Sequence, residues 1–312
     1  MTRQAKSWLF QDQLEKPEDF VLYRPRAYGG LGLVHIESKA TAHQIRSFIE
    51  SAVHPAFRRN IFHEALYKWH VENDRTIINP GLPPYYPDSF FAKIRQVKEE
   101  SLLNIITMHT ATWYKGLLEN YITHEVNDNG TREYKLCKTE TKNPNIDWEN
   151  TWSLAVTPGL CSDMTSFLWR MLHGLLPTRE RLHRLNMPGI TSPLCDLCKL
   201  EAVDTTLHAL LQCPSSKPPA TLLLSAIQTV LPDILPAQLV LLDAHVEAKD
   251  QLPLMYLVTS VLSQIWAYRK SRKSCNLVSI RANLESGVQI LRKSRHHDAA
   301  RRIDEILMFV DQ

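Results

Sequence analysis

Cysteine is scarce in this sequence, which has only six in 312 residues. So few cysteines in a chain of this length exclude a disulfide-stabilised scaffold and favour a reducing compartment. Long apolar runs are also lacking. The most apolar stretch, Leu252 to Tyr268, contains Ser260, Ser263 and Gln264, and it falls short of the roughly 20 apolar residues that a membrane-spanning helix needs. We therefore interpret it as a buried core helix and expect no membrane contact.

The first residues lack the basic and then apolar order of a secretory signal. Together with the scarce cysteines, this absence predicts an intracellular protein, in the cytoplasm, the nucleus or both. The formal net charge is only +3, so attraction to phosphates would have to come from local groups of Lys and Arg rather than from the whole molecule.

Familiar catalytic signatures are missing as well. The sequence contains no nucleophile elbow, no phosphate-binding glycine loop and no HExxH helix. The glycines of GGLGL, from Gly29 to Leu33, lack the spacing of a dinucleotide fingerprint and are interpreted as turns. A hydrolase that uses His173, His183 or the His296-His297 pair with a carboxylate such as Asp298 ranks below both binding functions, because thirteen histidines make chance groupings easy. We expect a protein that is not an enzyme and has no small-molecule cofactor.

Apolar residues recur at helical spacing through most of the chain, for example at Ile45, Phe48, Ile49 and Ala52. This periodicity predicts a mainly α, multi-helical fold with a small zinc-binding subdomain and at most a short β-hairpin. The hairpin would turn at Asn129-Gly130, where a plain surface loop fits the sequence equally well.

The strongest local pattern is CDLCKLEAVDTTLHALLQCP, which spaces three cysteines and a histidine as C-x2-C-x9-H-x4-C. Two cysteines separated by two residues fit a tight turn that points both thiolates at one ion. Three sulfurs and one imidazole form a closed tetrahedral set with no vacancy for water, which is typical of a structural zinc ion. The predicted ligands of a structural Zn²⁺ are Cys195, Cys198, His208 and Cys213.

Asp204 is expected to begin a short helix that carries the histidine near its middle and Cys213 just past its end. Two alternatives to zinc stay open. The cysteines are also compatible with buried free thiols. A disulfide between Cys195 and Cys198 is the other alternative, although it would leave the spacing of His208 and Cys213 unexplained.

Basic residues are concentrated in two places. The helix expected after Pro177 carries three arginines that we predict to point outward while its leucines face the core. The section from Arg269 to Arg302 has ten Lys or Arg residues and two acidic residues, an excess of eight positive charges. Arginine and lysine at such densities favour phosphate binding, and a solvated basic surface is the alternative. The candidate nucleic-acid contacts are Arg170, Arg179, Arg181, Arg184, Arg269, Lys270, Arg272, Lys273, Arg292, Lys293 and Arg295.

The run FLWRMLHGLLPTRERLHRL, followed by the cysteine pair and by His-x4-Cys-Pro, resembles the zinc-binding domain at the C-terminus of non-LTR (LINE-type) retrotransposon reverse transcriptases. RPRAYGGLGL is similar to that family's segment just after the polymerase thumb, and IWAYRKSRK resembles its Trp-Arg helix after the zinc domain. The paired-aspartate polymerase signature and the endonuclease signature are absent. The resemblance therefore implies a non-catalytic module that binds RNA, DNA or both and is accessory to target-primed reverse transcription. The alternative is a protein-interaction module that docks on a polymerase portion or another partner chain.

These observations divide the chain into four expected parts. Residues 1–53 are a post-thumb remnant with a first helix, and residues 54–160 form a helical connecting region. Residues 161–218 are the zinc-binding domain, and residues 219–312 are a basic helical region at the C-terminus.

Overall fold

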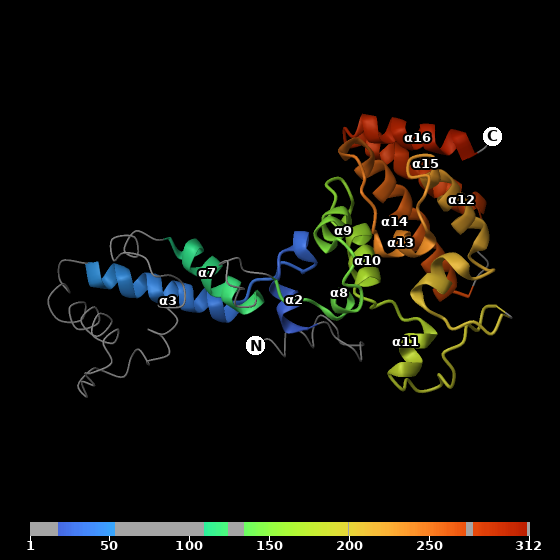
Figure 1. Cartoon of the computed structure of the whole chain (residues 1–312). Helices are drawn as coiled ribbons and strands as arrows, with labels where there is room; N and C mark the ends of the chain where they lie inside the picture. The colour runs from blue at the N-terminus through green and yellow to red at the C-terminus, as the bar shows by residue number, and fades with distance from the viewer. Residues whose placement is uncertain (1–17, 54–108, 124–133, 199, 273–276, 311–312) are drawn as a thin grey trace. The chain divides into compact units, whose positions relative to one another are not determined.

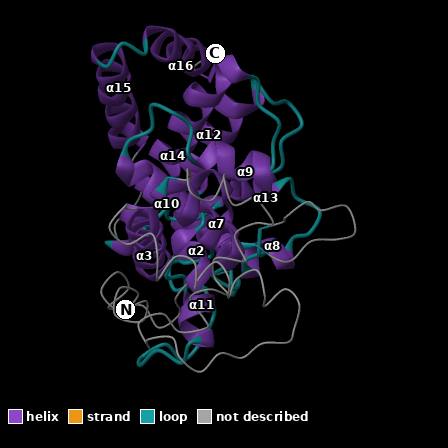
Figure 2. Cartoon of the chain, turned by 90° about the vertical axis from the view of Figure 1, so that its left-hand side faces the viewer, coloured by secondary structure: helices purple, strands orange, loops and turns teal. Residues whose placement is uncertain are grey.

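The computed structural model describes residues 18–53, 109–123, 134–198, 200–272 and 277–310 (Figure 1). Within these ranges the chain is helical and has no sheet, as Figure 2 shows. The β-type pairings found there are two isolated bridges, Thr123 with Tyr134 and Leu194 with Val203. These findings confirm the mainly α prediction. The expected hairpin turn at Asn129-Gly130 lies outside the described residues, and no helix among those described is long and apolar enough to cross a membrane.

The chain divides into two compact units. In the first, α7 (Thr110–Ile122) packs along α3 (Ile36–Val53), and the short α2 (Asp19–Tyr23) also contacts α7. Ile45 of the predicted apolar stripe and Trp113 are fully buried between these helices. We expected α3 to start near Thr41. It starts at Ile36 because Nδ1 of the His35 ring accepts a hydrogen bond from the Ser38 backbone N–H and so caps the first turn.

The second unit contains the segment Pro25–Gly30 and the chain from Leu136 to the C-terminus. Its helical elements are η1 (Arg26–Tyr28), α8 (Lys138–Lys142), α9 (Trp148–Ala155), α10 (Ser162–Leu172), α11 (Arg179–Arg184), η3 (His208–Gln212), α12 (Lys217–Gln228), α13 (Pro236–Leu241), α14 (Ala248–Lys270), α15 (Leu277–Lys293) and α16 (His297–Val310).

α14 forms the centre of the second unit. It contacts α10, α12, α15 and α16 and the turn η3 that carries His208. Most of its side chains between Pro253 and Ile265 are buried, which confirms the prediction of a core helix for this apolar stretch. At its N-terminal end, buried Asp250 accepts a hydrogen bond of 2.8 Å from Nε of Arg302 on α16, which ties the two helices together.

One carbonyl group of the segment Pro25–Gly30 is hydrogen-bonded to α10 and to the residue that follows it. The Gly29 oxygen lies 2.9 Å from Nε1 of Trp169, which donates to it, and 2.8 Å from Nε2 of His173. Trp152 stacks on the His173 ring with centroids 4.8 Å apart. Gly29 itself has a φ of +81°, and a Cβ atom there would lie 2.4 Å from Trp152. Only glycine fits this position without strain.

Candidate metal centre

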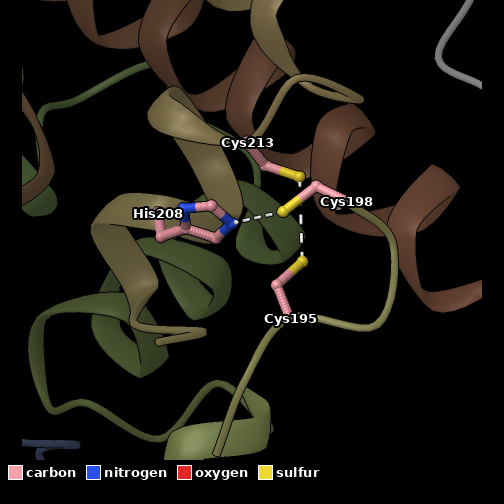
Figure 3. A group of neighbouring side chains, drawn as sticks. All are labelled: Cys195, Cys198, His208 and Cys213. Atoms are coloured by element: carbon pink, nitrogen blue, oxygen red, sulfur yellow. Dashed lines mark hydrogen bonds between the residues drawn. The ribbon is translucent and has the colours of Figure 1, made fainter. Parts of the chain in front are cut away.

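Cys195, Cys198, His208 and Cys213 point toward one another (Figure 3). One ligand atom from each lies within 4.8 Å of those from the other three. Cys195, His208 and Cys213 are buried, and Cys198 is half-buried. Among the described residues, this is the one cluster of at least three such side chains that could hold a metal ion. The structure therefore brings together all four residues that the spacing selected.

Two distances inside the cluster match the edges of a tetrahedral zinc site. With Zn–S bonds of about 2.3 Å and Zn–N bonds of about 2.0–2.1 Å, the edges of a regular tetrahedron are roughly 3.8 Å between sulfurs and roughly 3.6 Å between sulfur and nitrogen. The Cys195 and Cys213 sulfurs lie 3.8 Å apart, and the Cys198 sulfur lies 3.5 Å from Nε2 of His208. The residues present thus fit one Zn²⁺ ion.

A two-stranded turn positions the first pair of ligands. The Cys195 N–H donates to the Ala202 carbonyl at 2.8 Å, and the Asp204 N–H donates to the Pro193 carbonyl at 2.9 Å. These bonds flank the bridge between Leu194 and Val203 and hold Cys195 and Cys198 in the loop between its two arms. We call residues 193–204 the knuckle.

The second pair of ligands comes from η3 and from the residue that follows it. The Cys213 N–H donates to the His208 carbonyl at 2.7 Å, a bond that spans five residues and widens the turn beyond an α-helix. Cys213 follows the last residue of this turn, as predicted. The prediction that Asp204 caps the helix is wrong. Oγ1 of Thr205 accepts the His208 N–H at 3.0 Å, while the Asp204 carboxylate is held by other donors.

The protonation of the ligands also bears on metal binding. Burial lowers the pKa of His208, which favours the neutral imidazole that a metal requires. Burial raises the pKa of Cys198. Burial works in the same direction on Cys213, but hydrogen bonds involving Ser215, Arg269 and Cys195 outweigh it and lower the pKa of that thiol. The five cysteines within the described ranges are free, so no disulfide joins Cys195 to Cys198.

Two of the arginines expected to face solvent are buried. Arg181 is 7% exposed and donates from Nη1 to the Leu175 carbonyl at 2.9 Å, because its side chain folds back on the turn before α11. The Arg269 side chain is 8% exposed and forms an ion pair with Asp204. The outward orientation predicted for Arg181 is therefore wrong, and neither guanidinium group lies on the surface.

The other basic candidates lie nearer the surface. Nη1 of Arg179 and Nη2 of Arg272 both contact Oδ2 of Asp196, at 3.2 and 3.1 Å. Arg292 pairs with Asp304 on α16. Lys273 lies outside the described residues. The remaining candidates share an exposed position and are Arg170, Arg184, Lys270, Lys293 and Arg295.

A closed set of three cysteines and one histidine is typical of the structural metal sites of small zinc-binding modules. Residues 131–218, which include all four ligands, match the family described as "zinc-binding in reverse transcriptase". This part of the chain is thus similar to a zinc-binding domain found in reverse transcriptases. Searches of curated proteins and of solved structures found no match to the chain.

The roles of two residues beside the ligands were missed in the sequence analysis. Asp204 accepts hydrogen bonds from Arg179 and Arg269 rather than capping the predicted helix, and Arg269 lies next to the cluster. Nη2 of Arg269 lies 3.2 Å from the Cys195 sulfur. Arg269 and Cys195 are 74 positions apart in the sequence, so no local spacing pattern could have predicted their contact. Arg269 comes from the C-terminal turn of α14, whose basic residues we had assigned to phosphate binding.

Proposed function

We propose that Cys195, Cys198, His208 and Cys213 hold one structural Zn²⁺, and that the unit built around it binds RNA or DNA without catalysing a reaction. The match to a reverse-transcriptase zinc-binding domain supports this proposal. In keeping with the resemblance of the sequence to the LINE-type family, the chain would act inside the cell as an accessory part of target-primed reverse transcription. Bound zinc would supply cohesion to the knuckle and no reactive group.

Metal analysis tests the first half of the proposal. Purified protein should contain one zinc ion per chain, and both Cys195→Ser and His208→Ala should lose it. Cys161→Ser is the matched control, because Cys161 is exposed and lies outside the cluster. Equal zinc content in all four proteins would refute the site.

One observation carries the second half of the proposal. Arg179 starts α11 and Arg272 follows the end of α14, yet both guanidinium groups converge on the Asp196 carboxylate of the knuckle. Two cations around one anion leave a local positive excess, and the Arg272 side chain is 75% exposed. A phosphate oxygen has the charge and the acceptor geometry to take the place of that carboxylate.

Binding of a fluorescent RNA hairpin and of a DNA duplex, each titrated over a range of salt concentrations, tests this step. Arg179→Ala and Arg272→Ala should each reduce the salt dependence of binding by about one ion and weaken affinity for both probes. Asp196→Asn should tighten binding, because it removes the competing carboxylate, and its zinc content is measured alongside. Arg301→Ala is the control, since Arg301 is exposed and pairs with Asp298 next to it on α16. No binding of either probe by the original protein at low salt would refute the proposal.

A second candidate function, docking on a polymerase portion or another protein, is favoured by the apolar surface of the knuckle. Leu194, Leu200 and Val203 are 37%, 63% and 44% exposed. Exposed apolar side chains that gather on one small element are typical of interaction sites. Leu200→Asp should abolish such docking and leave salt-dependent nucleic-acid binding intact, which separates the two functions.

A further inference from the structure

The Arg269 side chain reaches the metal cluster from α14, a helix that supplies no ligand. Its Nη2 donates to the Cys195 sulfur at 3.2 Å and also to Oδ1 of Asp204. Its Nη1 is buried and makes no hydrogen bond within the described part of the chain. A guanidinium group with five N–H donors, buried against thiols and a carboxylate, serves the anions around it rather than solvent.

Asp204 holds this guanidinium in place. The Asp204 side chain is 3% exposed, and its Oδ2 accepts the backbone N–H of Arg179 at 2.9 Å. Its own N–H donates to the Pro193 carbonyl and fixes it at the end of the knuckle. Asp204 therefore joins three segments: its carboxylate contacts the start of α11 and the end of α14, and its backbone N–H holds it in the knuckle.

The charges of a loaded site explain why a cation is needed here. Zn²⁺ with three thiolates and one neutral imidazole has a net charge of −1. An anion that is mostly removed from water is costly unless a cation or hydrogen-bond donors compensate it. Arg269 provides both, since it carries a permanent positive charge and donates directly to a ligand sulfur.

We infer that Arg269 is a positioning residue of the zinc site, which holds the Cys195 thiolate in place and neutralises the zinc-thiolate centre while Asp204 orients it. This inference rests on the zinc site proposed above. It also removes Arg269 from the proposed nucleic-acid interface, and it means that the C-terminal end of α14 supports the zinc site as well as carrying basic residues. Partners of this kind around metal ligands typically contribute 10- to 100-fold to metal affinity.

Zinc competition with a chromogenic chelator measures the effect. Arg269→Gln should raise the zinc dissociation constant by about 10- to 100-fold, and Arg269→Lys, which keeps the charge but not the fork, should lie between it and the original protein. Arg301→Gln is the matched control, because Arg301 is an exposed arginine that pairs with Asp298 on α16 rather than with a ligand sulfur. Its zinc affinity should equal that of the original protein.

Cobalt substitution supplies a readout that a purely structural role would not change. An N–H donor lowers the energy of the sulfur lone pair, so its loss should move the sulfur-to-cobalt charge-transfer band to longer wavelength in Arg269→Gln and, if that variant fails to fold, in Arg269→Lys. Band and affinity unchanged from the original protein in the folded variants would overturn the inference while leaving the zinc site intact. Absence of zinc from the original protein would instead overturn the site itself.

Discussion

Replacing Gly29 by alanine tests whether the segment Pro25–Gly30 stabilises the second compact unit, which carries the Cys/His cluster. Gly29 has a φ of +81°, where a residue with a Cβ atom is strained by about 1–2 kcal/mol. The new methyl group would also lie 2.4 Å from Cε2 of buried Trp152, and overpacking of this kind costs roughly 1–3 kcal/mol. We therefore expect Gly29→Ala to lower the free energy of unfolding by about 2–5 kcal/mol.

Gly189→Ala is a closely matched control. Gly189 has a φ of +80°, yet nothing lies within 4 Å of the position its Cβ would take. Both variants restrict the unfolded chain equally, so that contribution cancels in the comparison. Urea unfolding followed by circular dichroism and tryptophan fluorescence should show a loss of only about 1–2 kcal/mol for Gly189→Ala. Equal losses in the two variants would show that the contact with Trp152 does not constrain Gly29, and the reasoning would fail.

Three further predictions concern the same unit. Arg181→Ala should destabilise it by about 1–3 kcal/mol in urea unfolding, because the buried Leu175 carbonyl loses its donor, whereas exposed Lys270→Ala should have little effect. Burial raises the pKa of Cys137 from 9.0 to about 12, so mass spectrometry after iodoacetamide treatment at pH 8 should find Cys137 unmodified and exposed Cys161 alkylated. Because the pKa of this thiol is higher in the folded than in the unfolded state, the free energy of unfolding should also fall as pH rises above about 9. Gly287→Ala should lower the melting temperature although alanine is the better helix former, because the new Cβ would lie 1.9 Å from the hydroxyl oxygen of Tyr256 on α14.

The metal cluster was predictable from sequence because its information is local. All four ligands lie within a stretch from Cys195 to Cys213, and the stereochemistry of short turns restricts how such spacings can point. The apolar stretch of α14 was predictable for a similar reason. A helix with so few polar residues has to be surrounded by other helices, whichever helices those are.

The fate of individual arginines was not predictable. A helical pattern shows which side chains share a face of the helix, but not which carbonyl or carboxylate of another segment lies against that face. Arg181 is buried because the turn before α11 presents the Leu175 carbonyl to it. Arg269 is buried because Asp204, 65 residues earlier in the sequence, lies against the end of α14. Such long-range pairs depend on how the helices pack, which the periodicity of one segment does not contain.

Part of the positive charge counted in the C-terminal section is paired with carboxylates in the folded structure. Arg292 pairs with Asp304, Arg301 with Asp298, and Arg302 with buried Asp250. The Arg292 pair joins α15 to α16, the Arg302 pair joins α16 to α14, and all three pairs occupy cations that a phosphate could otherwise contact. A count of charges along the sequence therefore overstates the basic surface, and the expected salt dependence of binding is correspondingly modest.

The arrangement around Asp204 and Asp196 links the metal to the basic residues that remain. The knuckle is too small to bury a core of its own, so its shape would depend on the zinc ion that we propose its ligands hold. The same knuckle carries Asp196, where Arg179 and Arg272 meet, and ends at Asp204, which fixes the start of α11 and the end of α14. Loss of the ion would release both carboxylates at once and let the two arginines separate. The proposed zinc ion would in this way decide whether Arg179 and Arg272 are held together, without itself contacting the nucleic acid that we propose they bind.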